Sequence, residues 1–149
     1  MATRREIIAL AAGGAAAAWL DAKSSSAAPH EAAAAVAEFT GGKSPERGKV
    51  TIELPDAVED GSSVPLAVAV DHPMEADNFI SDILVVSEGN PRPAVATFRF
   101  TPLSGRAQAT TRIRLAGSQT IIVVAKTSDG RFFRAQKPVQ VTIGACTGT

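Results

Sequence analysis

Residues 95–116, VATFRFTPLSGRAQATTRIRLA, contain the clearest structural pattern of the chain. In the first part of this stretch Phe98 and Phe100 fall on one side of an extended strand, and Arg99 falls on the other. Strict alternation of this kind indicates a half-buried β-strand. The Leu-Ser-Gly sequence at 103–105 predicts a hairpin-type turn, because glycine adopts the positive φ that other residues resist. A second β-rich run, ATTRIRLA, follows the turn.

Similar runs recur from residue 48 to residue 143, separated by segments rich in Gly, Pro, Asn and Asp. They are GKVTIEL, VPLAVAVD, FISDILVVSE, VATFRFT, ATTRIRLA, TIIVVAKT and RFFRAQKPVQVTI. No window in this range keeps a helical period. Short strands at regular spacing predict an all-β protein, an immunoglobulin-like antiparallel β-sandwich of about seven strands.

Three local features refine this prediction. Ser128-Asp129-Gly130 predicts a second hairpin-type turn. Pro138 cannot donate a ladder hydrogen bond, so the last strand is expected to be split or to lie at a sheet edge. Residues 38–48, EFTGGKSPERG, are expected to form a loop or a single helical turn packed on the sandwich.

Residues 1–36 have the composition of an export signal. Arg4 and Arg5 precede a moderately apolar stretch at 7–20, and small residues follow. This order predicts a signal of the twin-arginine type, cleaved between Ala28 and Ala37, and therefore a periplasmic protein. The apolar run is shorter and richer in alanine than a membrane span. Two alternatives are an ordinary signal with arginines paired by chance and an amphipathic helix of the mature domain.

The chain is thus divided into an export signal at 1–36, a sandwich domain at 37–143 and a flexible C-terminal arm at 144–149. Lys and Arg together number 15, as do Asp and Glu. A neutral chain without a basic block is not expected to bind nucleic acid or an anionic membrane.

Candidate catalytic residues are few. His72 is the only histidine outside the predicted signal, and Cys146 is the only cysteine. No Gly-x-Ser-x-Gly, Cys-x-x-Cys or paired-histidine motif occurs, and one histidine and one cysteine do not make a zinc site. The sequence therefore predicts a non-catalytic protein without metal or cofactor. One alternative is an enzyme that uses His72 as base and Cys146 as nucleophile.

Cys146 is the fourth residue from the end of the sequence, in VTIGACTGT. It has no cysteine to pair with inside the chain, and its neighbours offer little apolar surface for burial. The small residues around it, Gly144, Ala145, Thr147 and Gly148, would form a slim arm that carries the sulfur ~10 Å beyond Ile143. We therefore expect Cys146 to be a covalent attachment site presented to other proteins.

The motifs DHPM, EGNP, SGRA and TRIRLAGSQ, together with VTIGAC, resemble the SoxY family of sulfur carriers in periplasmic thiosulfate oxidation, over residues 39–146. The resemblance implies a twin-arginine signal, an immunoglobulin-like sandwich and a heterodimer with SoxZ. It also implies that Cys146 carries thiosulfate as a cysteine S-thiosulfonate. SoxAX would couple the thiosulfate, SoxB would release sulfate, and in some organisms SoxCD would oxidise the remaining sulfur.

The tail differs from the Gly-Gly-Cys-Gly-Gly of the family. Ala145 and Thr147 replace glycines on either side of Cys146, and they are expected to stiffen the arm. An alternative function from another class is a structural immunoglobulin-like module whose Cys146 joins two copies through a disulfide.

Overall fold

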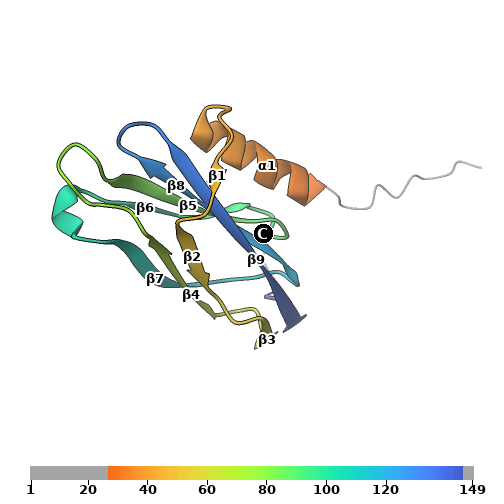
Figure 1. Cartoon of the computed structure of the whole chain (residues 1–149). Coiled ribbons are helices and arrows are strands. Elements are labelled where there is room, and N and C mark those ends of the chain that lie inside the picture. Colours follow the sequence, from red (N-terminus) through yellow and green to blue (C-terminus); the bar gives the residue numbers. More distant parts are fainter. Residues whose placement is uncertain (1–26, 146–149) are drawn as a thin grey trace, which may run out of the picture.

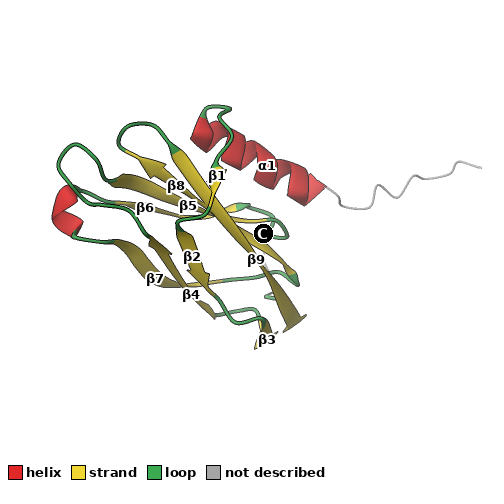
Figure 2. Ribbon diagram, in the orientation of Figure 1, coloured by secondary structure: helices red, strands yellow, loops and turns green. Residues whose placement is uncertain are grey.

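The computed structural model describes residues 27–145, which form one helix, α1 (Ala27–Thr40), and nine strands (Figures 1 and 2). The strands are β1 (Glu46–Arg47), β2 (Val50–Glu53), β3 (Ala57–Asp60), β4 (Val64–Val70), β5 (Ile80–Ser87), β6 (Ala94–Arg99), β7 (Ala107–Ile113), β8 (Gln119–Thr127) and β9 (Phe132–Ile143). One sheet has the order β1-β9-β8-β5-β6, with β3 also paired to β9. The other sheet has the order β2-β4-β7. The predicted immunoglobulin-like β-sandwich is therefore confirmed, with nine strands in place of about seven. The short strands β1 and β3 pair in parallel with β9.

The main core lies between the two sheets. In β4, Val64, Leu66 and Val68 are buried while the residues between them are more exposed, as expected for a strand with one face toward the core. Ile83 and Val123 of the larger sheet belong to the same cluster and are fully buried. The alternating hydrophobicity of β4 thus identifies the side chains that point into the core between the two sheets.

Strands β5 and β8 are buried on both faces. Their continuous apolar runs place Leu84 and Ile122 in a second cluster on the outer side of the larger sheet. Helix α1 covers this side, with Ala32 fully buried and Phe39 packed edge-on against Phe132, 6.0 Å between ring centroids. Figure 1 shows the helix lying across the larger sheet. The helix is therefore part of the packed domain.

The start of this helix differs from the sequence expectation. The boundary predicted between residues 36 and 37 falls inside α1, whereas Glu38, Phe39 and Thr40 form its last turn, which is the helical alternative expected for this segment. The physical reason is burial, because Ala32 and Val36 lie against the sheet and hold this alanine-rich segment in a helix. Arg4 and Arg5 lie outside the described residues. Between residues 27 and 145, no helix has the length and apolarity needed to cross a membrane.

The two predicted turns have different outcomes. Residues 128–130 join β8 and β9, which pair antiparallel, and Gly130 has φ 87°, so this hairpin is confirmed. Residues 103–105 do not make a hairpin, because β6 and β7 belong to different sheets. The chain crosses the sandwich there through a 3₁₀ turn, Pro102–Ser104, and Gly105 takes the positive φ.

The last strand is continuous through its proline. Pro138 pairs in register with Thr120 of β8. On the other side of β9, β1 reaches only Arg134 and β3 begins at Gln140. Pro138 therefore occupies the gap between β1 and β3, where a missing N–H breaks no ladder. Of the two expectations for this strand, the edge position is therefore confirmed locally at Pro138, whereas the strand is not split.

Candidate functional site at the end of the last strand

Strand β9 leads directly to the tail that carries Cys146, so the residues around the end of this strand form the candidate site. Val139 is the last residue of β9 that pairs with β8. Beyond it, β9 pairs in parallel with β3, as far as Asp60 opposite Ile143. The end of β9 thus pairs with β3 and no longer with β8. This pairing fixes the direction in which the chain leaves the sandwich.

Three backbone segments meet where β9 ends. The Gly61 N–H donates to the Ile143 carbonyl, 2.8 Å between nitrogen and oxygen. The Leu115 N–H donates to the Gly61 carbonyl, also at 2.8 Å. The Ala145 N–H donates to the Leu115 carbonyl, again at 2.8 Å. The root of the predicted arm is therefore bonded to the domain at both Ile143 and Ala145.

Two glycines permit this close approach. A Cβ on Gly144 would lie 1.9 Å from the Ala116 carbonyl oxygen, and a Cβ on Gly61 would lie 2.3 Å from the Leu115 carbonyl oxygen. Both distances are far below any real contact of a Cβ atom, and both obstacles are backbone atoms. The missing side chain of Gly144 thus permits the tail to lie against the domain.

A buried polar cluster holds the loop that receives the tail. Asn90 is 8% exposed, and its Nδ2 donates to the Arg114 carbonyl at 2.7 Å. Its Oδ1 accepts from the Ala116 N–H at 2.9 Å and from Nε2 of Gln119 at 3.0 Å. Ser87 also bonds to Gln119. The loop is therefore fixed on both sides of Leu115.

The turn that contains Gly61 is fixed by Asp60. The Asp60 carboxylate accepts hydrogen bonds from the Ser62 backbone N–H at 2.8 Å and from the Ser62 hydroxyl at 2.9 Å. These bonds stabilise the charged carboxylate and lower the pKa of Asp60 below its usual range, the backbone bond contributing most. Ser118 completes the site by accepting the Val141 N–H at 2.8 Å.

His72 lies at the opposite end of β9. Its ring centroid is 6.1 Å from that of Phe133, and its Nε2 is 2.9 Å from Oδ1 of Asn78. From Phe133 to Ile143 the strand extends roughly 33 Å at ~3.3 Å per residue. The three residues from Ile143 to Cys146 reach at most about 11 Å. The geometry therefore does not support His72 as a base for Cys146.

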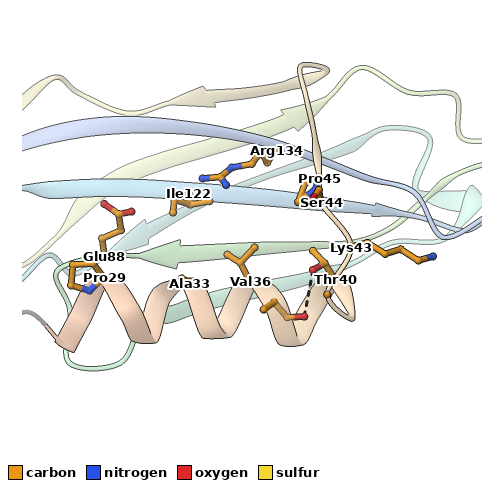
Figure 3. Close-up of a pocket in the computed structure, with 12 residues that line it drawn as sticks. Pro29, Ala33, Val36, Thr40, Lys43, Ser44, Pro45, Glu88, Ile122 and Arg134 are labelled. Carbon is orange, nitrogen blue, oxygen red and sulfur yellow. Dashed lines mark hydrogen bonds between the residues drawn. The ribbon is translucent and has the colours of Figure 1, made fainter.

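A shallow groove of about 270 Å³ lies between α1 and the larger sheet (Figure 3). Val36, Ile122 and Pro29 form part of its apolar lining, and Glu88 and Arg134 lie at its edge. The described residues that line it do not include those at the end of β9, so the groove is distinct from the site there.

Of the predicted site residues, Gly144 and Ala145 are placed by the structure, whereas Cys146, Thr147 and Gly148 lie outside the described residues. Within residues 27–145, no three His, Cys, Asp or Glu side chains come close enough to hold a metal ion. The sequence did not indicate Gly61, Asn90 or Gln119. Asn90 and Gln119 lie in EGNP and AGSQ, which have the composition of turns, and the hydrogen bond between their side chains became apparent only from the fold.

These observations define the protein as an immunoglobulin-like β-sandwich whose single thiol follows its last strand. The family model for the sulfur oxidation protein SoxY matches residues 36–146, a range that ends at Cys146. The chain belongs to the SoxY family, which confirms the resemblance found in the sequence. No curated protein sequence matches the chain.

Solved structures agree with this assignment. The structure of the sulfur carrier protein SoxY from Chlorobium limicola f thiosulfatophilum is similar, with a TM-score of 0.64 and 28% identity over 76% of this chain and 98% of that chain. A superoxide reductase (neelaredoxin) from Ignicoccus hospitalis has a TM-score of 0.57 and 22% identity over 63% of this chain and 80% of its own. The reductase shares the fold alone.

Proposed function

We propose that the protein is a periplasmic carrier of sulfur intermediates in thiosulfate oxidation, with Cys146 as the covalent attachment site. The observation that carries the proposal is the family match, which ends at the single cysteine of the chain. The solved SoxY structure to which the chain is similar is described as a sulfur carrier protein. The absence of a second thiol makes Cys146 the one site at which a persulfide-type bond can form.

The loading step is an oxidation of two sulfur atoms. The Cys146 thiol and thiosulfate form a cysteine S-thiosulfonate, Cys–S–S–SO₃⁻, and release one proton and two electrons. The electrons require an acceptor, which we assign to a heme enzyme partner of the SoxAX type. Hydrolysis by a SoxB-type partner then adds water, releases sulfate and two protons, and leaves Cys–S–S⁻ on the carrier. Each catalyst is a partner, so the carrier itself is not an enzyme.

We propose a second β-sandwich chain of the SoxZ type as the permanent partner, with which the protein forms a heterodimer. SoxCD-type enzymes would act on the remaining sulfur where they occur. An ordinary cysteine thiol has a pKa near 8.5, so only a small fraction of it is thiolate at neutral pH. That suits a carrier whose reactivity is supplied by the enzyme that receives it.

The test is intact-mass spectrometry of the carrier with its partner after exposure to thiosulfate and the oxidising enzyme. We expect one thiosulfonate group per chain, and none on a Cys146→Ser variant. The same adduct on the variant would contradict the proposal. So would a wild-type chain that forms only a reductant-sensitive homodimer and takes up no sulfur, which is the behaviour of a structural module joined by a disulfide.

A further inference from the structure

We propose that Gly61, Leu115, Ala116, Gly144 and Ala145 form a clasp, by which the domain grips the root of the carrier arm. In this arrangement Gly144 is an anchoring residue and not a hinge, and the chain is held as far as Ala145. The inference deepens the proposed carrier function and rests on it for its biological meaning. The clasp itself is a statement about hydrogen bonds and close contacts that needs no sulfur to be tested.

The clasp has one firm side and one weak side. Leu115 is fully buried, and Asn90 bonds to the backbone of the residues before and after it. In contrast, the described residues beyond Ile143, Gly144 and Ala145, are held by one hydrogen bond, from the Ala145 N–H to the Leu115 carbonyl. If a side chain is added at Gly144, the tail will therefore move and the loop will stay.

The clasp sets the length of chain that can present the thiol. With the clasp closed, Cys146 is joined directly to a residue held on the domain. Releasing Gly144 and Ala145, together with the carbonyl of Ile143, adds about 7 Å of extended chain. Because the attachment consists of two terminal hydrogen bonds, it can open without unfolding the sandwich. An enzyme that receives the thiol in a deep site would then bind the open form.

A pair of glycine substitutions provides the test. Gly144→Ala places a Cβ 1.9 Å from the Ala116 carbonyl oxygen. Gly117→Ala is the control, because Gly117 directly follows Ala116 but a Cβ there meets nothing within 4 Å. Amide hydrogen exchange of Gly61 and Ala145 is followed by NMR in both variants and in the wild type. We expect the Ala145 and Gly61 amides of Gly144→Ala to exchange at least tenfold faster, and those of Gly117→Ala to keep the wild-type rate.

The reach of the arm is measured separately by labelling the thiol. Free iodoacetamide and a maleimide attached to a polymer bead are compared, because only the bead requires the arm to extend. The ratio of bead to free labelling should rise several-fold in Gly144→Ala and stay constant in Gly117→Ala. If Gly144→Ala does not fold, Ala145→Pro removes the same hydrogen bond by removing its donor, and it should raise the labelling ratio in the same way.

Two results would overturn the clasp. One is an Ala145 amide that exchanges in the wild type at the rate of an unstructured peptide. The other is a Gly144→Ala chain that matches Gly117→Ala in both exchange and labelling. Neither readout depends on sulfur loading, whereas the carrier function is decided by the thiosulfonate adduct on the wild-type chain. Failure of the clasp and failure of the carrier function are therefore distinguishable.

Discussion

Asp60 links the turn that contains Gly61 to the pH of the surroundings. Its folded-state pKa is lowered by the two hydrogen bonds from Ser62. A lowered carboxylate pKa adds stability that is fully present above the unfolded pKa of about 3.9. This stability is lost as the pH falls through the lower pKa of the folded state, because the protonated carboxyl is a poorer acceptor. The turn is therefore weakened by acid and is indifferent to changes above about pH 5.

The Asp60→Asn variant should show this directly, because its amide still accepts a hydrogen bond but does not titrate. We expect the wild type to have the higher melting temperature at neutral pH, and the difference between the two proteins to shrink as the pH falls below about 4. Differential scanning calorimetry from pH 7 to 3 measures it. Asp77→Asn, at an exposed position elsewhere, serves as the control. A difference in melting temperature between the wild type and Asp60→Asn that stays constant from pH 7 to 3 would contradict this prediction.

Gly144 and Asn90 show which features of the site a sequence cannot reveal. In a sequence, a glycine is compatible both with a flexible hinge and with a close backbone contact. At Gly144 the position of the Ala116 carbonyl shows a close contact. Asn90 in EGNP has the composition of a turn, yet its amide is buried and bonded to a loop 24 residues later in the chain. Cys146 could be proposed from sequence because its isolation is itself a sequence property. The groups that hold the tail could not.

At the scale of elements, periodicity predicted the strands well and the helix poorly. Strand β4 alternates because one of its faces is more exposed, and the central parts of β5 and β8 are continuously apolar because α1 covers their outer face. Helix α1 is rich in alanine, which occurs equally in signal segments and in helices, so composition did not separate the two. The 103–105 turn was placed correctly, but its strands could not be assigned to the same or different sheets from local residues.

Helix α1 should contribute measurable stability through Ala32, which is fully buried against the larger sheet. Ala32→Leu forces a larger side chain into this contact and should lower the free energy of unfolding by about 1–3 kcal/mol. Ala34→Leu, at an exposed position of the same helix, should change it by less than about 0.5 kcal/mol. Leucine is nearly as good a helix former as alanine, so intrinsic helix propensity does not explain a difference. Urea denaturation of both variants measures the effect, and equal stabilities would mean that the helix does not pack as described.

At the scale of the whole molecule, the packed domain reaches further toward the N-terminus than the sequence suggested. A peptidase that cut at the later of the predicted sites, near Ala37, would remove Ala32 and most of α1. The outer face of β5 and β8 would then lose its cover and expose Leu84 and Ile122 to water. A cut at the earlier sites, near Ala28, keeps nearly the whole helix. The architecture therefore favours the early sites if the chain is exported as proposed.

We accordingly expect the exported protein to begin before Ala32. Intact mass and N-terminal sequencing of the chain from the periplasmic fraction measure the start. A variant with both Arg4→Lys and Arg5→Lys should remain as the full-length precursor inside the cell if the twin-arginine route is used, whereas an ordinary signal tolerates lysine. A mature chain that begins at or after Ala32 would contradict the role of α1 as a permanent cover of the sheet, because the domain would then function without it.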